Sequence, residues 1–237
     1  MTDIRESLKQ KAEREQVPLS EHQLDLFQIY MQELIMWNEK MNLTAITDPE
    51  EIVVKHFLDS LLLAPFLPEK EVFSFADVGT GAGFPGVPIM ILHPDIRMVL
   101  IDSLQKRLTF LEALCQKLFL SPELLHARAE ECGRNPRYRE TFDIVTARAV
   151  APLNVLAEYC LPLLKQGGAF IAMKGPGGID EAHAAKSAIQ LLGGSISNIV
   201  TKSISNEITR TFIVIEKRRQ TPEKYPRRGV KITKNPL

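Results

Sequence analysis

A glycine-rich segment between two apolar runs constrains the fold of this chain more than any other feature. The segment reads Asp77-Val78-Gly79-Thr80-Gly81-Ala82-Gly83-Phe84-Pro85-Gly86. The apolar residues of 72–78 predict a buried strand, and the apolar run 87–92 can open a helix. A strand that ends in closely spaced glycines brings backbone N–H groups next to a ligand with no Cβ in the way. We therefore predict a nucleotide or nucleoside site at this loop.

An acidic residue at the end of the next predicted strand supports this interpretation. The apolar residues 98–101 predict that strand, and Asp102 follows it directly. In a βαβ unit this position brings a carboxylate to the ribose hydroxyls of a bound nucleotide. A tight turn without a ligand would need neither the three glycines nor the acids, so it accounts poorly for the pattern.

Two kinds of ligand fit the loop. Residues 81–86 match the dinucleotide pattern G-x-G-x-x-G, which alone is a weak signal. S-adenosylmethionine fits better, because Asp77 stands where its carboxylate can orient the loop or contact the methionine ammonium group. Pro85 and Pro88 also occupy the region where a pyrophosphate-binding helix would present free N–H groups. We predict S-adenosylmethionine as the cofactor and keep a dinucleotide oxidoreductase as an alternative.

Composition narrows the class of protein. The chain has 237 residues, of which 45% are hydrophobic, and this suits one α/β domain with an appendage. No apolar run approaches the ~20 residues of a membrane span, and the first residues are charged rather than signal-like. The three cysteines show no metal-binding spacing, so we expect reduced thiols, no metal site and a cytoplasmic protein that does not bind membranes.

The formal net charge of zero hides an uneven distribution. Residues 1–71 carry a net charge of −7, whereas residues 217–237 hold eight basic residues against one acid. Binding to a polyanion depends on local basic patches rather than on the total charge. A nucleic-acid contact and a merely solvated basic tail are both compatible with this ending.

From residue 72 onward the pattern alternates strands with helices, as in a doubly wound parallel sheet. Before it, Ser20 opens a helix over residues 21–38 with a capping box, and Asp48 caps a second helix. The predicted strands are 72–78, 98–101, 124–126, 142–146, 169–173, 196–200 and 209–216, and the predicted helices among them include 105–119, 153–164 and 180–192.

This order predicts five wound strands closed by an antiparallel hairpin, which is the layout of the class I methyltransferases. We expect an α/β fold of this class: a Rossmann-like, mostly parallel seven-stranded sheet over residues 72–216. A helical appendage is expected over residues 1–71 and a basic tail over residues 217–237.

Several separated segments resemble one family. They are WNEKMNLTAITDPEEIVVKHFLD at 37–59, the glycine loop with its FPG ending, TARAVAPL at 146–153, Lys174-Gly175 with Glu181, and KYPRR…KNPL at 224–237. Together they resemble the ribosomal RNA small subunit methyltransferase G family, also called the glucose-inhibited division protein B family. The resemblance implies transfer of a methyl group from S-adenosylmethionine to N7 of a guanosine in small-subunit rRNA. Residues 227–231 depart from the family's usual tail, which leaves the RNA contacts there open.

The resemblance also implies site residues. The cofactor positions are Gly79, Gly81, Phe84, Asp102, Ala129, Glu130 and Arg148, and the RNA-contacting positions are Lys174, Arg227 and Arg228. Structural alternatives stand beside some of them. Glu130 can be a helix-start acid, and Lys174 can be a solvated strand end. His56 and Asp59 form a predicted polar pair in which His56 packs through hydrogen bonds rather than acting as an acid or base.

The predicted chemistry needs no catalytic side chain. Guanine N7 has a free lone pair and carries no proton, so no general base is expected. The Asn/Asp-Pro-Pro-aromatic run that accompanies exocyclic amine methylation is absent from 147–150, and no cysteine stands where carbon-5 methylation needs a nucleophile. The partner is expected to be small-subunit rRNA or a 30S-type particle, and the protein a monomer. A small-molecule methyltransferase and a nonenzymatic RNA-binding protein with a vestigial cofactor fold remain the alternatives.

Overall fold

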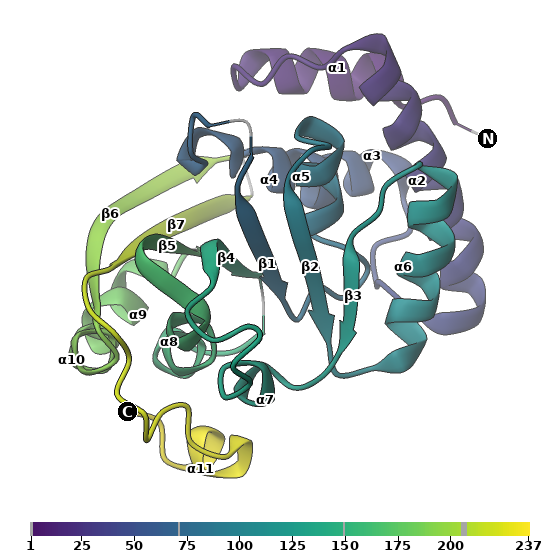
Figure 1. Ribbon diagram of the computed structural model, residues 1–237. Coiled ribbons are helices and arrows are strands. Elements are labelled where there is room, and N and C mark those ends of the chain that lie inside the picture. The colour runs from purple at the N-terminus through teal and green to yellow at the C-terminus, as the bar shows by residue number, and fades with distance from the viewer. Residues whose placement is uncertain (1, 71, 149, 205–207) are drawn as a thin grey trace.

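A seven-stranded sheet forms the centre of the computed structural model, which describes residues 2–70, 72–148, 150–204 and 208–237 (Figure 1). The strand order is β3-β2-β1-β4-β5-β7-β6, in which β7 runs antiparallel to both neighbours and the other pairs are parallel. The strands are β1 (Ser74–Val78), β2 (Arg97–Asp102), β3 (Glu123–His126), β4 (Phe142–Arg148), β5 (Leu164–Lys174), β6 (Gly194–Ser203) and β7 (Thr209–Lys217). The predicted fold class is therefore confirmed.

Helices cover both faces of the sheet. Before the sheet lie α1 (Arg5–Arg14), α2 (Glu21–Met41), α3 (Pro49–Ile52), the π-helix η1 (Val53–Leu58), α4 (Asp59–Leu61) and the 3-10 helix η2 (Ala64–Phe66). Within and after it lie α5 (Gly86–Leu92), α6 (Gln105–Lys117), α7 (Ala129–Cys132), α8 (Leu153–Cys160), the 3-10 helix η3 (Leu161–Leu163), α9 (Gly178–Ala184), α10 (Lys186–Leu191) and α11 (Gly229–Lys234).

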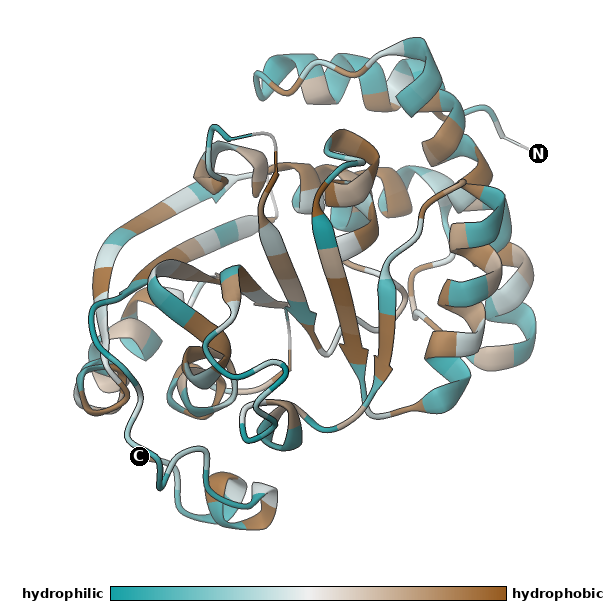
Figure 2. Ribbon diagram, viewed as in Figure 1, coloured by the Kyte–Doolittle hydropathy of each residue, from teal (hydrophilic) through white to brown (hydrophobic). Residues whose placement is uncertain are grey.

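The strands bury successive side chains in two different hydrophobic clusters. In β2, Met98 and Leu100 belong to the cluster beneath α2, α5 and α6, whereas Val99 and Ile101 belong to the cluster beneath α8 and α10. Side chains alternate between the faces of a strand, so a sheet covered on both sides reads as a continuous apolar run. Figure 2 shows this run as hydrophobic colour along the central strands.

The N-terminal helices share a hydrophobic core with the sheet. Ile4, Leu8 and Tyr30 are fully buried in the same cluster as Phe75 of β1. The predicted capping box at Ser20 is present, and α2 continues to Met41, where Asn42 ends it in the left-handed conformation (φ +51°). These helices support the glycine loop, because the Tyr30 hydroxyl donates a hydrogen bond to the carbonyl of Ala82.

The C-terminal basic segment is folded against the body of the protein. Its first residue, Lys217, ends β7 with its ammonium group buried against the carbonyl groups of Leu161 and Leu164. Farther on, Ile232 of α11 is fully buried. Figure 1 shows α11, in yellow, near α7. The sequence predicted neither α11 nor α1.

Candidate active site

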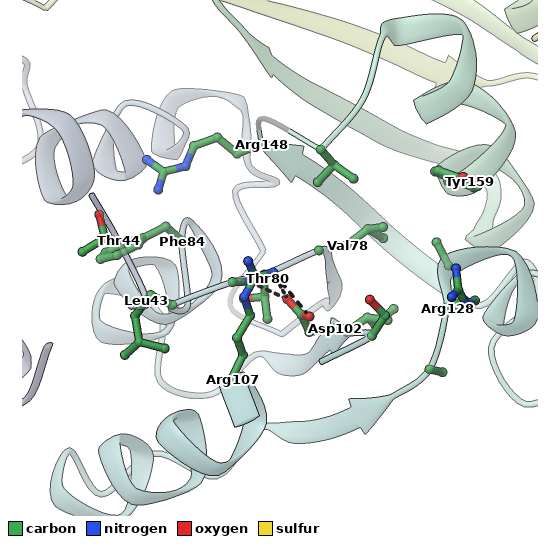
Figure 3. A pocket seen from close by; sticks show the side chains of 18 of the residues that line it. Leu43, Thr44, Val78, Thr80, Phe84, Asp102, Arg107, Arg128, Arg148 and Tyr159 are labelled. Atoms are coloured by element: carbon green, nitrogen blue, oxygen red, sulfur yellow. Dashed lines mark hydrogen bonds and ion pairs between the residues drawn. The ribbon is translucent and has the colours of Figure 1, made fainter. Parts of the chain in front are cut away.

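A cavity of about 510 Å³ opens at the carboxyl ends of β1, β2 and β4. The chain order reverses between β1 and β4, and such a switch point is where open α/β sheets bind ligands. All seven predicted cofactor residues line this cavity. Figure 3 shows Thr44, Phe84 and Arg148 on one side and Arg128 and Tyr159 on the other, with Asp102 between them.

The glycine loop reaches the cavity through backbone conformations that favour glycine. Gly79 and Gly81 have φ values of +70° and +62°, in the left-handed region. The Gly79 N–H donates to the carbonyl of Ile101 over 2.9 Å, which joins the loop to the end of β2. A Cβ built on Gly79 would lie 2.6 Å from Cγ2 of Val150 across the cavity wall. Gly79 therefore has no room for a side chain beside Val150, and a larger residue here would displace the cavity wall.

Asp77 holds the loop from beneath. Its Oδ2 atom accepts hydrogen bonds from the Thr80 hydroxyl (2.7 Å) and the Gly86 N–H (2.9 Å). Burial raises the pKa of the Asp77 carboxyl to about 6, against the opposing effect of these hydrogen bonds. Asp77 does not line the cavity. Of the two roles that the sequence offered, the structure supports orientation of the loop.

Asp102 lies at the middle of the cavity with most of its surface covered. Its carboxylate accepts hydrogen bonds from the Gly81 and Leu104 N–H groups, each over 2.9 Å, and from Arg107 over 3.1 Å. Arg107 also contacts the other carboxylate oxygen over 3.5 Å, so a carboxylate with about four acceptor sites can accept from a hydroxyl in the cavity by giving up this long contact. The sequence did not identify Arg107, which is the third residue of α6.

The start of α7 forms the far end of the cavity. Ala129 and Glu130 are the first residues of this helix, and Glu130 is only 8% exposed. Glu130 is a helix-start acid, as the structural alternative held, and it also lines the cavity. Gly229 of the C-terminal segment packs against its carboxylate so closely that a Cβ there would collide with it.

Arg148 organises the opposite end of the cavity. Its guanidinium donates to Oδ2 of Asp59 over 2.9 Å, and Arg210 of β7 donates to the two oxygens of the same carboxylate over 2.7 and 2.8 Å. Asp59 is fully buried, and two guanidinium groups share its single negative charge. Arg148 also lies over the ring of Phe84, 5.1 Å from its centroid.

His56 is a packed, uncharged member of this end. Its ring stacks on Phe84 with a centroid separation of 4.5 Å and an interplanar angle of 16°. Burial and the nearby Arg148 guanidinium lower the pKa of His56 to about 4. The expectation that His56 packs through hydrogen bonds agrees with this arrangement. The predicted direct pair with Asp59 is replaced by a bridge, because Arg148 donates to both residues.

Two predicted RNA contacts have their charges engaged within the protein. The Lys174 ammonium lies 2.8 Å from Glu181 and donates to the carbonyl of Ala151, and Lys174 is 8% exposed. Arg227 forms a bidentate ion pair with the fully buried Glu158. These ion pairs engage both charges within the protein, and contact of either residue with RNA stays a prediction. Arg228 is exposed, and its contact with RNA stays a prediction.

The chain matches a known protein family over most of its length. The profile of the family described as rRNA small subunit methyltransferase G matches residues 23–210. The chain belongs to this family. It is 49% identical to the ribosomal RNA small subunit methyltransferase G of Oceanobacillus iheyensis over 98% of its own length and 96% of that protein. It is 50% identical to the protein of the same name from Acetivibrio thermocellus over 93% of this chain and 91% of that one.

Solved structures support the fold alone. A provisionally assigned class I S-adenosylmethionine-dependent methyltransferase from Listeria monocytogenes superposes with a TM-score of 0.58. The match covers 84% of this chain and 71% of that one at 13% sequence identity. Within the described residues, no helix combines the length and the apolar character needed to cross a membrane.

Proposed function

We propose that this protein transfers the methyl group of S-adenosylmethionine to N7 of a guanosine in small-subunit ribosomal RNA. The observation that carries the proposal is the cavity at the switch point of the sheet. The glycine loop, Asp102 and Arg148 all line it, at the carboxyl ends of three adjacent strands. The family supports the reaction and the rRNA substrate, and the resemblance described above supports the atom that is methylated.

The residues present fit this cofactor. Glycine at position 79 keeps the loop backbone open to the cavity, because any side chain there would collide with Val150. Asp102 can accept a hydrogen bond from a ribose hydroxyl in place of its long contact with Arg107, and Ala129 and Glu130 can read the edge of an adenine at the far end. The opposite end, with Phe84 and Arg148, would hold the methionine part. When bound, the cofactor supplies a methyl group that its sulfonium makes electrophilic.

The acceptor chemistry agrees with the side chains at this end. The lone pair on N7 forms the new C–N bond while the C–S bond breaks and its electron pair stays on sulfur, so no proton has to be removed. Among the described residues that line the cavity, the carboxylates are Asp102 and Glu130, and Figure 3 shows Asp102 apart from Phe84 and Arg148. His56 is held neutral. The protein therefore contributes alignment of the reacting atoms and exclusion of water.

The basic face of α11 supports an RNA substrate. Arg228, Lys231 and Lys234 are exposed on or beside this helix, which the Gly229 contact places next to the cavity. Exposed cations on a docked helix attract phosphate groups and make binding dependent on salt. We propose a 30S-type particle or its rRNA as the form that binds there, and a monomeric enzyme. A methyltransferase for a small molecule would not need this surface.

The decisive experiment supplies radiolabelled S-adenosylmethionine and small ribosomal subunits from a strain that lacks this gene. Mass spectrometry then identifies the methylated nucleoside. The proposal expects 7-methylguanosine from the wild-type protein and no product from Gly79→Val, which should not bind the cofactor. A different methylated nucleoside would refute N7 as the acceptor. Cofactor binding without transfer to either subunits or free rRNA would refute the substrate.

A further inference from the structure

We infer that Thr44 determines specificity for guanine by donating a hydrogen bond to the oxygen at position 6 of the target base. The inference rests on the proposed function. A chain of hydrogen bonds runs from Arg148 through His56 to Thr44. The direction of each bond in this chain decides whether the Thr44 hydroxyl can donate to a ligand or only accept from it. Thr44 lines the cavity at the same end as Phe84 and Arg148 (Figure 3).

The chain of hydrogen bonds begins at Arg148. A guanidinium group can only donate hydrogen bonds, so the contact of 3.3 Å between its NH2 atom and Nδ1 of His56 makes Nδ1 an acceptor. The same guanidinium donates from Nη1 to the carbonyl of Lys55 over 3.1 Å, which helps to hold it against His56. Asp59 fixes the guanidinium in this position through the buried ion pair. His56 Nδ1 therefore carries no proton.

The neutral ring then carries its proton on Nε2. This atom lies 2.9 Å from the Thr44 hydroxyl oxygen, to which it donates. The lowered pKa of His56 agrees with a ring that stays uncharged at neutral pH. The orientation of the ring is set by its stacking on Phe84, so this donor is aimed by packing as well as by Arg148.

A second donor takes the remaining acceptor site of the hydroxyl. The backbone N–H of Ile46 donates to Oγ1 of Thr44 over 3.1 Å. A hydroxyl has one donor and two acceptor sites, and both acceptor sites are now occupied. The loop that carries it is itself fixed, since the Thr44 N–H donates to the side chain of Asn38 over 2.9 Å. What Thr44 presents to the cavity is a positioned donor.

A donor at this place distinguishes the two purines. Guanine presents two acceptors, N7 and O6, on the edge that must face the reacting methyl group, whereas adenine presents N7 beside an amino group that donates. The Thr44 hydroxyl can pair with O6 and would meet the adenine amino group donor to donor. A site built to hydrogen-bond its substrate rejects the analogue that lacks the group, because a polar group is then left unpaired.

The test combines enzyme variants with altered bases. Small-subunit rRNA is ligated with guanosine, inosine or 2-aminopurine at the methylated position and assembled into particles, and kcat/KM is measured for each. Inosine keeps O6 and N7, whereas 2-aminopurine keeps N7 and lacks O6. For the wild-type protein we expect 2-aminopurine to react about tenfold more slowly than inosine, the size of one hydrogen bond.

Thr44→Val keeps the shape of the side chain and removes the hydroxyl. We expect it to abolish the preference for inosine over 2-aminopurine, and Thr44→Ser to restore it. Because each preference compares two substrates on one variant, a general loss from a displaced loop cancels. An unchanged preference in Thr44→Val, with 7-methylguanosine still made, would overturn the role of Thr44 alone. A wild-type protein that makes no 7-methylguanosine would overturn the proposed function instead.

Discussion

The ion pair between Arg227 and Glu158 predicts a large and specific effect of one substitution. Glu158 is fully buried, and its carboxylate accepts from the Arg227 backbone N–H (2.7 Å), from Nε (2.9 and 3.1 Å) and from NH2 (2.6 Å). Arg227→Met removes the three side-chain contacts and leaves a buried charge with one backbone donor. Breaking such a pair costs about 3–5 kcal/mol, and the retained donor favours the lower end, about 3 kcal/mol.

The lost ion pair can either destabilise the whole protein or release the C-terminal segment. Urea unfolding detects the first effect, and limited proteolysis detects the second. A drop of about 3 kcal/mol in the free energy of unfolding is expected if the C-terminal segment stays docked. If the segment detaches instead, water reaches Glu158 and trypsin cleaves after Lys231, a site that the test and control variants both keep. Arg228→Met serves as the matched control, because this neighbouring side chain is exposed. The reasoning would be refuted if the free energy of unfolding of Arg227→Met lay within about 1 kcal/mol of the wild-type value and the variant resisted trypsin equally well.

A double variant separates docking from direct RNA contact. Replacing both partners by methionine removes the buried charge together with its counter-ion, and such replacements are often close to neutral for stability. We therefore expect the double variant at positions 158 and 227 to recover stability relative to Arg227→Met. If Arg227 acts only by holding the segment in place, rRNA methylation recovers as well. If its guanidinium contacts phosphate, methylation stays low while stability recovers.

Three further predictions follow from single positions. Gly79→Val should lower the affinity for S-adenosylmethionine at least 100-fold in calorimetry, because its Cβ would meet Val150, while the circular dichroism spectrum keeps the folded form. Gly229→Ala should weaken cofactor binding or release α11, since the new methyl group would collide with Glu130; unchanged affinity and protease resistance would contradict this. The unfolded chain protonates His56 near pH 6.5 and the native protein near 4, so stability should fall by about 3 kcal/mol between these pH values as the pH drops, and His56→Gln should remove that part of the slope in urea unfolding.

The sheet could be predicted because its signals are local. Each central strand is a short apolar run followed by glycine, acidic or polar residues. These runs therefore indicate where the strands lie along the chain and which edge of the sheet carries the site, before any contact is known. The helices at the two ends lack such a signal. The buried positions Ile4, just before α1, and Leu8 and Ala12 within it recur every four residues, but the charged residues among them resemble a solvated segment. The predicted helix 180–192 is divided in the structure, where α9 ends and α10 begins around Ala185.

The sequence predicted those site residues whose place depends only on their position along the backbone. Gly79, Asp102, Glu130 and Arg148 stand at or just after strand ends, and parallel strands bring such residues to one edge. The exposure of a charged side chain depends on partners elsewhere in the chain. The partner of Arg227 lies 69 residues away in α8, so counting charges in the tail could not show that this cation is neutralised.

The buried carboxylate of Asp59 reduces the positive charge that a cationic cofactor would meet in the cavity. Arg148 lines the end of the cavity where a cationic sulfonium would react, and Arg210 contacts the same Asp59 carboxylate behind it, so their like charges would oppose its binding. Asp59 lies 2.9 Å from one guanidinium and 2.7 Å from the other, so it offsets one of the two charges where water cannot screen them. The same carboxylate fixes Arg148, which sets the proton on His56 and through it the donor on Thr44. One buried acid thus governs both the charge that the cofactor meets and the hydrogen bond that the target base meets.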